Sequence, residues 1–173
     1  MEDIIELRHQ LHALAELSGR EIETNRFLCE WIEATHPDVL VKNIGGYGLA
    51  SVYRGRLPGK RVMIRGDIDA LHISEPNDIP YRSQHQGVSH KCGHDGHAAR
   101  LCGLARQLAE CRPQHGEVVL LFQPAEETGQ GAKAVISDPK FKDIVPDTAY
   151  GLHNLPGFAK GQVLIRKGCF AAA

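Results

Sequence analysis

The apolar residues of this chain repeat at helical spacing in some stretches and form short strand-like runs in others. One helical stripe runs through residues 3–17, and a second follows the sequence "SGRE" at 18–21. That sequence is typical of a capping box, in which Ser18 and Glu21 together cap the start of a helix. A third stripe covers 97–111. The pattern therefore predicts three packing helices.

Between and after these helices, short runs rich in β-branched and aliphatic residues predict strands. The runs at 39–45 and 49–55 are joined by "GGYG", which favours a hairpin. The run "EVVLLFQPAEE" at 117–127 is apolar until Gln123-Pro124 and fits a strand buried on both faces, as in a parallel sheet covered by helices. Strands alternating with helices predict an α/β fold. The remaining runs predict strands at 61–67, 148–157 and 161–168 and a short helix at 131–138.

The composition fits one globular domain and argues against several classes of partner. The chain has 173 residues, of which 42% are hydrophobic and 24% charged, which is enough for a sizeable core. The formal net charge of −1 gives no electrostatic footprint for nucleic acid or an anionic membrane. No apolar run approaches the roughly 20 residues that span a bilayer, and the N-terminus lacks the features of a signal peptide. Five cysteines without a C-x-x-C pair favour a reducing compartment, so we expect a cytoplasmic location.

Candidate ligands follow the predicted strands at the points where the strands end. Carboxylates follow two of the strands and an imidazole follows a third; these residues are Asp67, Asp69, Glu126, Glu127 and His153. In open α/β sheets, functional sites assemble outside the carboxyl ends of the strands. We therefore expect these side chains to share one rim of the sheet.

The densest cluster of reactive residues is "SHKCGHDGHAARLCG" at 89–103, at the start of the third helical stripe. Cys92 and His94 lie two positions apart, and Gly93 and Gly96 would let the backbone fold so that both side chains reach one ion. Thiolate and imidazole suit zinc, and added carboxylates also admit manganese or cobalt. Two alternatives stay open: a Cys92 nucleophile with a histidine base, and a structural loop whose histidines take no part.

The acidic pairs also allow more than one role. Glu126 and Glu127 could divide the work, one binding an ion and the other accepting a proton from water. They could equally form a solvated acidic turn. Asp67 and Asp69 could hold a ligand histidine in one tautomer, as carboxylates behind metal ligands do, or they could cap a turn.

The other histidines give weaker indications. His90 and His97 flank the Cys92 cluster, and each could support a ligand or be merely a local neighbour. Three more fit solvated loop positions: His72, His85 and His115.

Four motifs in this order, "RGDIDAL", "HKCGHDGH", "FQPAEE" and "GLHNLPG", resemble those of the metal-dependent N-acyl-amino-acid amidohydrolases. That family includes hippurate hydrolases and plant auxin–amino acid conjugate hydrolases. It belongs with aminoacylases and glutamate carboxypeptidases in one clan of co-catalytic metallopeptidases. The opening sequence, "LRHQLHALAELSGRE", is also similar to the family's first helix, so the resemblance covers essentially the whole chain.

The resemblance implies a role for each matched residue. Glu126 matches the general acid/base, and Asp69 matches the aspartate behind the metal site. Asp67 stands where related enzymes have a ligand histidine, so its role stays open. The implied cofactor is a pair of divalent ions, zinc or manganese, with cobalt or nickel as alternatives. The residues that match metal ligands, the first of them the bridging ligand, are Cys92, His94, Glu127 and His153.

The implied reaction is hydrolysis of the amide bond of an N-acyl or N-aroyl amino acid, a small-molecule substrate. Glu126 would accept a proton from water and pass it to the leaving amine. Two alternatives stay open beside this function: a catalytically dead metal-binding fragment, and a hydrolase that uses Cys92 as its nucleophile.

The implied fold is the three-layer α/β sandwich of the zinc peptidases, with a central mixed, largely parallel sheet and helices on both faces. Family members continue into a lid domain, often the surface for homo-oligomer formation, and then return to the catalytic domain, where a last ligand histidine resides. Residues 154–173 contain no histidine. We therefore expect residues 1–173 to form the N-terminal part of the catalytic domain, without the lid.

Overall fold

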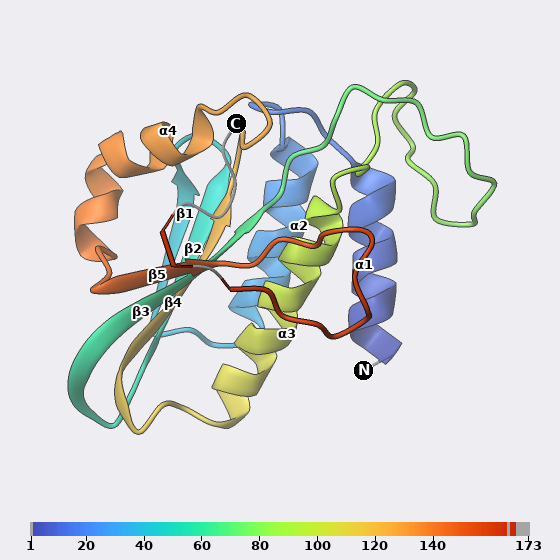
Figure 1. Ribbon diagram of the computed structural model, residues 1–173. Coiled ribbons are helices and arrows are strands. Elements are labelled where there is room, and N and C mark those ends of the chain that lie inside the picture. Colours follow the sequence, from blue (N-terminus) through green and yellow to red (C-terminus); the bar gives the residue numbers. More distant parts are fainter. Residues whose placement is uncertain (1, 166, 169–173) are drawn as a thin grey trace.

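The structure is built on one five-stranded sheet with the strand order β1-β2-β4-β3-β5 (Figure 1). A computed structural model of the chain describes residues 2–165 and 167–168. β1 pairs antiparallel with β2 and β2 antiparallel with β4, whereas β3 pairs parallel with both β4 and β5. The sheet is therefore mixed, and β2 alone runs against the other strands. The strands are β1 Val39–Ile44, β2 Gly48–Arg54, β3 Leu57–Asp67, β4 His115–Gln123 and β5 Thr148–Gly151.

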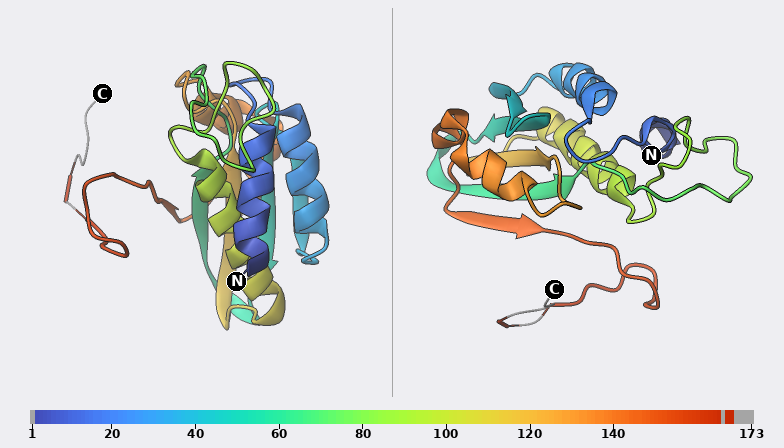
Figure 2. Two further views of the ribbon diagram at one scale, coloured as in Figure 1. Left: turned by 90° about the vertical axis from the view of Figure 1, so that its right-hand side faces the viewer. Right: turned by 90° about the horizontal axis from the view of Figure 1, so that it is seen from above.

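Helices cover both faces of this sheet, which makes three layers (Figure 2). One face carries α1 (Glu2–Leu14), α2 (Ile22–Glu33) and α3 (His94–Glu110). The other face carries α4 (Gly131–Ser137) and the 3₁₀ helix η1 (Pro139–Asp143). The expected α/β sandwich is confirmed. Within the described residues, none of the helices is both long enough and apolar enough to cross a membrane.

The central strand β4 supplies side chains to two separate cores. Leu120 and Phe122 pack with α1, α2 and α3, whereas Val119 and Leu121 pack on the opposite face with α4 and η1. Successive side chains of a strand point to opposite faces, so a strand covered on both sides must be apolar throughout. This explains the uninterrupted apolar run that precedes Gln123.

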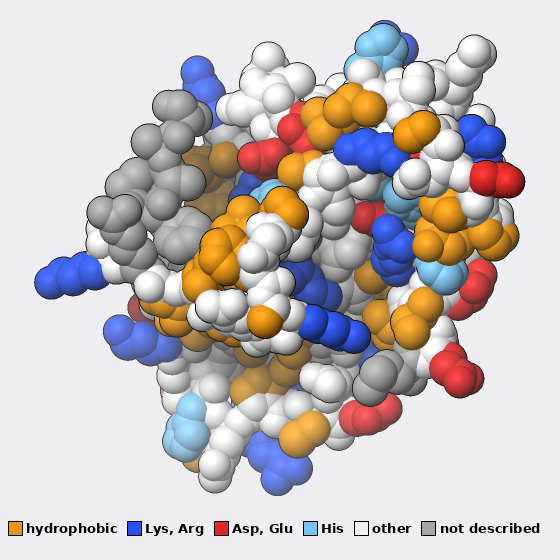
Figure 3. Space-filling view, turned by 45° about the vertical axis from the view of Figure 1, so that its right-hand side comes forward, with side chains coloured by type: hydrophobic (Ala, Val, Ile, Leu, Met, Phe, Trp, Pro, Cys, Tyr) orange, Lys and Arg blue, Asp and Glu red, His pale blue; other side chains and the backbone are white. Residues whose placement is uncertain are grey.

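β5 forms the edge of the sheet and lies outside both cores. All its residues are exposed, and the segment that follows leaves hydrophobic side chains on the surface (Figure 3). The strand predicted at 161–168 is wrong for the described part of that range, which has no strand. A strand needs a pairing partner or a buried face, and here Val163 and Ile165 are 71% and 89% exposed.

The capping box predicted at 18–21 is also wrong. The hydroxyl of Ser18 donates instead to Asp69 Oδ2 at 2.7 Å, and Glu21 accepts a hydrogen bond from the backbone of Ala125. At the start of α2, the carboxylate of Glu16 accepts a hydrogen bond from the Thr24 amide at 2.8 Å. Tertiary partners have therefore taken the two side chains that the local pattern assigned to the helix.

His12 of α1 ties together parts of the chain that are distant in sequence. Its Nδ1 and Nε2 atoms each lie 2.7 Å from a buried carboxylate, Asp95 in α3 and Glu75 in the long connection 68–93. With both carboxylates ionised, both ring nitrogens donate, which requires the protonated imidazole. His12, Glu75 and Asp95, here called the His12 cluster, thereby fix the connection that leads into α3.

The His12 cluster should make the free energy of unfolding depend on pH. The hydrogen bond to Asp95 raises the pKa of His12 despite its burial, so this contribution is complete below the ordinary value of 6.5 and is lost as pH rises through the folded pKa. Lys91 and His12 lower the pKa of Glu75. Burial would raise the pKa of Asp95, but the hydrogen bond from His12 and the nearby positive charges together lower it. The carboxylate contributions are present above the ordinary values of 4.5 and 3.8 and are lost on acidification. Urea denaturation as a function of pH measures the loss of stability at both high and low pH.

Replacement of His12 tests the loss of stability that is expected as pH rises. We expect His12→Gln to lower the free energy of unfolding at pH 6 by about 3 kcal/mol, because it leaves buried carboxylates short of a charged donor. The variant should also lose the decline that wild type shows above pH 6.5. The matched control is His115→Gln, at an exposed histidine. Equal pH profiles for wild type and His12→Gln would contradict the assignment.

Candidate metal centre

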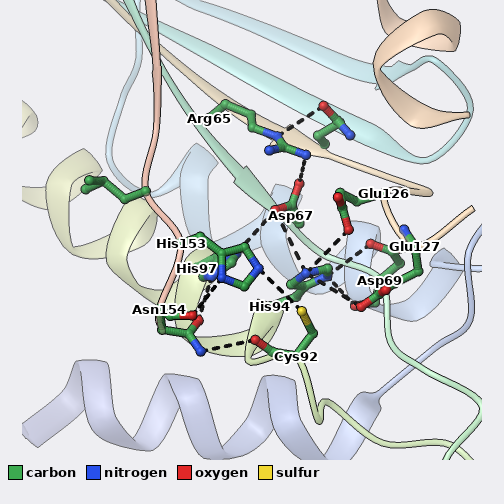
Figure 4. A network of polar contacts seen from close by, with 12 residues as sticks. Arg65, Asp67, Asp69, Cys92, His94, His97, Glu126, Glu127, His153 and Asn154 are labelled. Atoms are coloured by element: carbon green, nitrogen blue, oxygen red, sulfur yellow. Dashed lines mark hydrogen bonds and ion pairs between the residues drawn. The ribbon is translucent and has the colours of Figure 1, made fainter. Parts of the chain in front are cut away.

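Three parallel strands and the start of one helix bring the candidate residues to one edge of the sheet (Figure 4). Asp67 is the last residue of β3, Glu126 and Glu127 follow β4, and His153 follows β5. His94 is the first residue of α3, which begins three positions before the predicted start. The side chains therefore meet outside the carboxyl ends of the strands, as the strand-end rule implies.

Of the two ring nitrogens of His94, Nδ1 makes hydrogen bonds and Nε2 makes none within the described residues. Its Nδ1 atom lies 2.9 Å from the backbone oxygen of Asp69 and 3.2 Å from Asp69 Oδ1, so Nδ1 carries the hydrogen and donates. The ring is fully buried, and among the described residues Nε2 has no hydrogen-bond partner. Three carboxylate oxygens surround Nε2 at 3.8–3.9 Å, from Asp67, Glu126 and Glu127.

Asp69 is held in place from three directions. It accepts hydrogen bonds from the hydroxyl of Ser18 at 2.7 Å and from the Glu127 amide at 3.0 Å, in addition to its contact with His94. Burial alone would raise the pKa of Asp69, but these hydrogen bonds outweigh it and hold the pKa below the ordinary value. Asp69 is therefore an ionised carboxylate that orients the His94 ring. Ser18 was not expected at this site.

The charges around His94 also set its proton affinity. Burial would lower the pKa of His94, but the hydrogen bond to Asp69 and the charge of Asp67 outweigh it, so the pKa is raised. A buried ring surrounded by carboxylates attracts either a proton or another cation at Nε2.

Cys92 and His153 close the other side of the cluster. Cys92 Sγ lies 3.4 Å from His153 Nε2, and His153 Nδ1 donates to the backbone oxygen of Asn154 at 2.7 Å. The distance alone would suit a cysteine–histidine pair. However, burial and the charge of Glu127 raise the pKa of Cys92 to about 12, which is opposite to the activation that a thiolate nucleophile needs.

The donor atoms fall into three overlapping groups with a common member, His94. In each group the ligand atoms lie within 4.8 Å of one another. Sulfur, imidazole and carboxylate donors suit zinc and similar ions. His94 Nε2 and Glu127 Oε1 are buried and have no hydrogen-bond partner within the described residues, which fits a cation between them. The groups are Cys92–His94–His153, His94–Glu126–Glu127 and Asp67–His94–His97.

Glu21, which the local sequence pattern places in a capping box, instead holds the turn that carries Glu126 and Glu127. Ala125 has a positive φ of 49°, which is unusual for a residue with a side chain. Its amide donates to Glu21 Oε1 at 2.8 Å, and its carbonyl accepts from the Gly131 amide at 2.9 Å. Glu21 thus determines how the two glutamates leave β4, and the local sequence gave no signal for this contact.

The remaining candidates divide into members of the centre and bystanders. Asp67 forms an ion pair with Arg65, and its Oδ2 atom lies 3.3 Å from His97 Nδ1, so His97 belongs to the centre. His90 is buried beside the His12 cluster instead, and burial lowers its pKa to about 4. Three histidines are exposed, as expected: His72, His85 and His115.

Comparison with known proteins identifies relatives along the whole chain. Residues 63–168 match peptidase family M20/M25/M40. The chain is 39% identical over 173 residues to N-acetyl-L-cysteine deacetylase of Bacillus subtilis (strain 168) and 34% identical over 172 residues to N-acetyldiaminopimelate deacetylase of Listeria innocua. These matches cover 99% of this chain but only 41% and 46% of the two relatives. The chain therefore spans less than half of their length.

Comparison with solved structures also identifies a relative. The structure is similar to the crystal structure of the Bacillus subtilis YXEP protein, described as a dinuclear metal binding peptidase from the M20 family. The TM-score is 0.83 at 34% sequence identity, covering 90% of this chain and 43% of that one. Since the sequence match extends over more than half of its residues, the chain belongs to peptidase family M20/M25/M40.

Proposed function

We propose that residues 1–173 are the N-terminal part of the catalytic domain of a metal-dependent hydrolase that cleaves the amide bond of N-acyl amino acids. The observation that carries this proposal is the bare Nε2 atom of His94, buried and faced by three carboxylates. Such an atom is costly to bury without a partner, and a bound cation would satisfy it.

The residues that would hold the metal are Cys92, His94, Glu127 and His153. Their donors suit two zinc or manganese ions, with cobalt or nickel as alternatives. When bound, the metal would supply a Lewis acid that polarises the substrate carbonyl and makes water more acidic. The description of the related Bacillus subtilis protein as a dinuclear metal binding peptidase supports two ions.

Glu126 is the group best placed to move protons. Its side chain is 36% exposed, so it can reach both solvent and a substrate, and its Oε2 atom lies 3.8 Å from His94 Nε2. In our proposal Glu126 accepts a proton from the attacking water and delivers it to the leaving amine. Asp69 acts through His94, because its hydrogen bond holds a hydrogen on Nδ1 and directs Nε2 at the metal site.

The names of the relatives support an acetylated amino acid as the first substrate to test. Both relatives described above are named as deacetylases, one of N-acetyl-L-cysteine and one of N-acetyldiaminopimelate. Benzoyl amino acids are the second class to test. The four cysteines in the described part of the chain are free, which supports a reducing compartment such as the cytoplasm.

The first prediction concerns metal binding by the 173-residue chain. After treatment with a chelator, the chain should take up two equivalents of Zn²⁺ or Mn²⁺ in equilibrium dialysis, and the bound metal should raise the melting temperature. Free metal at 100 times Kd corresponds to about 2.7 kcal/mol of added stability. His94→Ala should abolish the uptake, and His115→Ala should retain it. Uptake by His94→Ala equal to wild type would refute the assignment.

The second prediction separates the two neighbouring glutamates. Glu126→Gln should lower the release of free amino acid from N-acetyl amino acids by about 10²- to 10⁴-fold, because it removes the proton acceptor. Its metal affinity should stay close to wild type, whereas Glu127→Gln should weaken metal binding directly. Undiminished hydrolysis by Glu126→Gln would exclude its role. A wild-type chain that binds metal without hydrolysis would instead favour the catalytically dead metal-binding fragment.

The third prediction tests the cysteine-nucleophile alternative. In the presence of chelator at pH 7.5, iodoacetamide should modify Cys92 more slowly than the exposed Cys111, because burial and Glu127 raise the pKa of Cys92 to about 12. Mass spectrometry of peptides follows both rates in one sample. Faster modification of Cys92, together with hydrolysis that survives chelator, would support the thiol mechanism instead.

A further inference from the structure

The segment that carries His153 has little packing to hold it. The described residues from 148 to 165 are all exposed, and β5 joins the sheet through β3 alone. A side chain on such a segment keeps much of its conformational freedom, and that freedom must be lost when it binds a metal. Nevertheless, His153 Nε2 lies within 3.4 Å of Cys92 Sγ.

The neighbouring residue, Asn154, uses both ends of its amide to hold this segment to the centre. Its Oδ1 atom accepts a hydrogen bond from His97 Nε2 at 2.7 Å, and its Nδ2 atom donates to the backbone oxygen of Cys92 at 3.2 Å (Figure 4). The amide therefore links the segment to the helix start and to the candidate ligand Cys92 at the same time.

The partner of Asn154 is itself rigidly placed. His97 is 2% exposed and lies in the first turn of α3, so its backbone moves with that of His94. Its other ring nitrogen, Nδ1, lies 3.3 Å from Asp67 Oδ2. Asp67 in turn pairs with Arg65, which donates to the side chain of Gln123. The chain of contacts ends on the last residues of β3 and β4.

Gly93 provides the space that this arrangement needs. Its φ of +87° begins α3, and a Cβ atom at this position would lie 2.9 Å from Asn154 Oδ1. A larger residue at 93 would therefore displace the amide. The backbone around the candidate ligands is shaped to admit the Asn154 side chain.

We propose that Asn154 and His97 are positioning residues that hold His153 against Cys92 and His94, so that an exposed segment supplies a ligand at low cost in conformational entropy. This inference rests on the proposed metal function. It adds two residues that would affect metal affinity by placing His153; His97 also lies in one of the three donor groups, with Asp67 and His94.

The test compares Zn²⁺ and Co²⁺ affinity in variants of the full 173-residue chain. Asn154→Leu removes both hydrogen bonds at similar size and should weaken metal binding by about 10- to 100-fold. His97→Asn removes the donor to Asn154 and should have the same effect, whereas His97→Gln retains a donor near the Nε2 position and should restore much of the affinity. The matched control is Lys160→Ala, in the same exposed segment.

Two readouts separate positioning from general damage. The melting temperature of the metal-free chain should fall only slightly in Asn154→Leu, because Asn154 is exposed and its replacement leaves only the His97 donor without its partner. Hydrogen exchange in residues 151–158 of the metal-free chain should become faster in Asn154→Leu but not in Lys160→Ala. The double variant His97→Asn with Asn154→Leu should lose no more affinity than either single variant, since both break the same contact.

The outcomes distinguish this inference from the proposed function. If the wild-type chain binds metal and Asn154→Leu binds it equally tightly, the positioning role is wrong and the metal function stands. If the wild-type chain binds neither Zn²⁺ nor Co²⁺, both fail. Weaker binding in Asn154→Leu, recovery in His97→Gln and unchanged binding in Lys160→Ala together support the inference.

Discussion

The hydrogen bond between His94 and Asp69 determines the chemistry of the whole centre. It fixes the proton on Nδ1 and leaves Nε2 as a lone pair directed at the acidic side chains. Asp69 can do this because Ser18 and the Glu127 amide hold it from two other segments. Parts of the chain from α1 to the end of β4 thus converge on a single imidazole. The core beneath it serves to keep these segments in register.

The fold creates an electrostatic conflict that a bound cation would relieve. Asp67, Glu126 and Glu127 converge near a buried ring. Burial and these three charges raise the pKa of Cys92, whereas the contact with Asp69 and the charges of Asp67 and Glu127 raise the pKa of His94 against the effect of burial. Folding brings these groups together at a cost, since like charges repel more strongly in a partly buried site. The acidic surroundings that make Cys92 a poor nucleophile would favour a bound cation, which in turn would lower the pKa of the thiol.

The sequence was informative where one short pattern decides the structure. The apolar run ending at Gln123 predicted a strand buried on both faces, and the strand-end rule brought Asp67, Glu126 and His153 to one edge. It failed where a contact depends on distant residues. Ser18 and Glu21 fit a local capping box equally well, but burial against Asp69 and Ala125 provided better partners. Asn154, His12 and Glu75 gave no local signal, because the contacts of His97 with Asn154 and of His12 with Glu75 and Asp95 join residues 57 to 83 positions apart.

The site joins a rigid part and a loosely held part of the molecule. His94, Asp69 and the glutamates stand on a frame with two buried cores, whereas His153 lies on an exposed edge segment. Besides the pairing of β5 with β3 and the hydrogen bond from Arg100 to the Leu152 carbonyl, the Asn154 amide holds that segment to the site, and a bound ion would order it further. Metal binding and ordering of the β5 edge are two aspects of one equilibrium in this view. Any contact that covers the exposed edge would reduce the entropy lost on binding and so raise the affinity for metal.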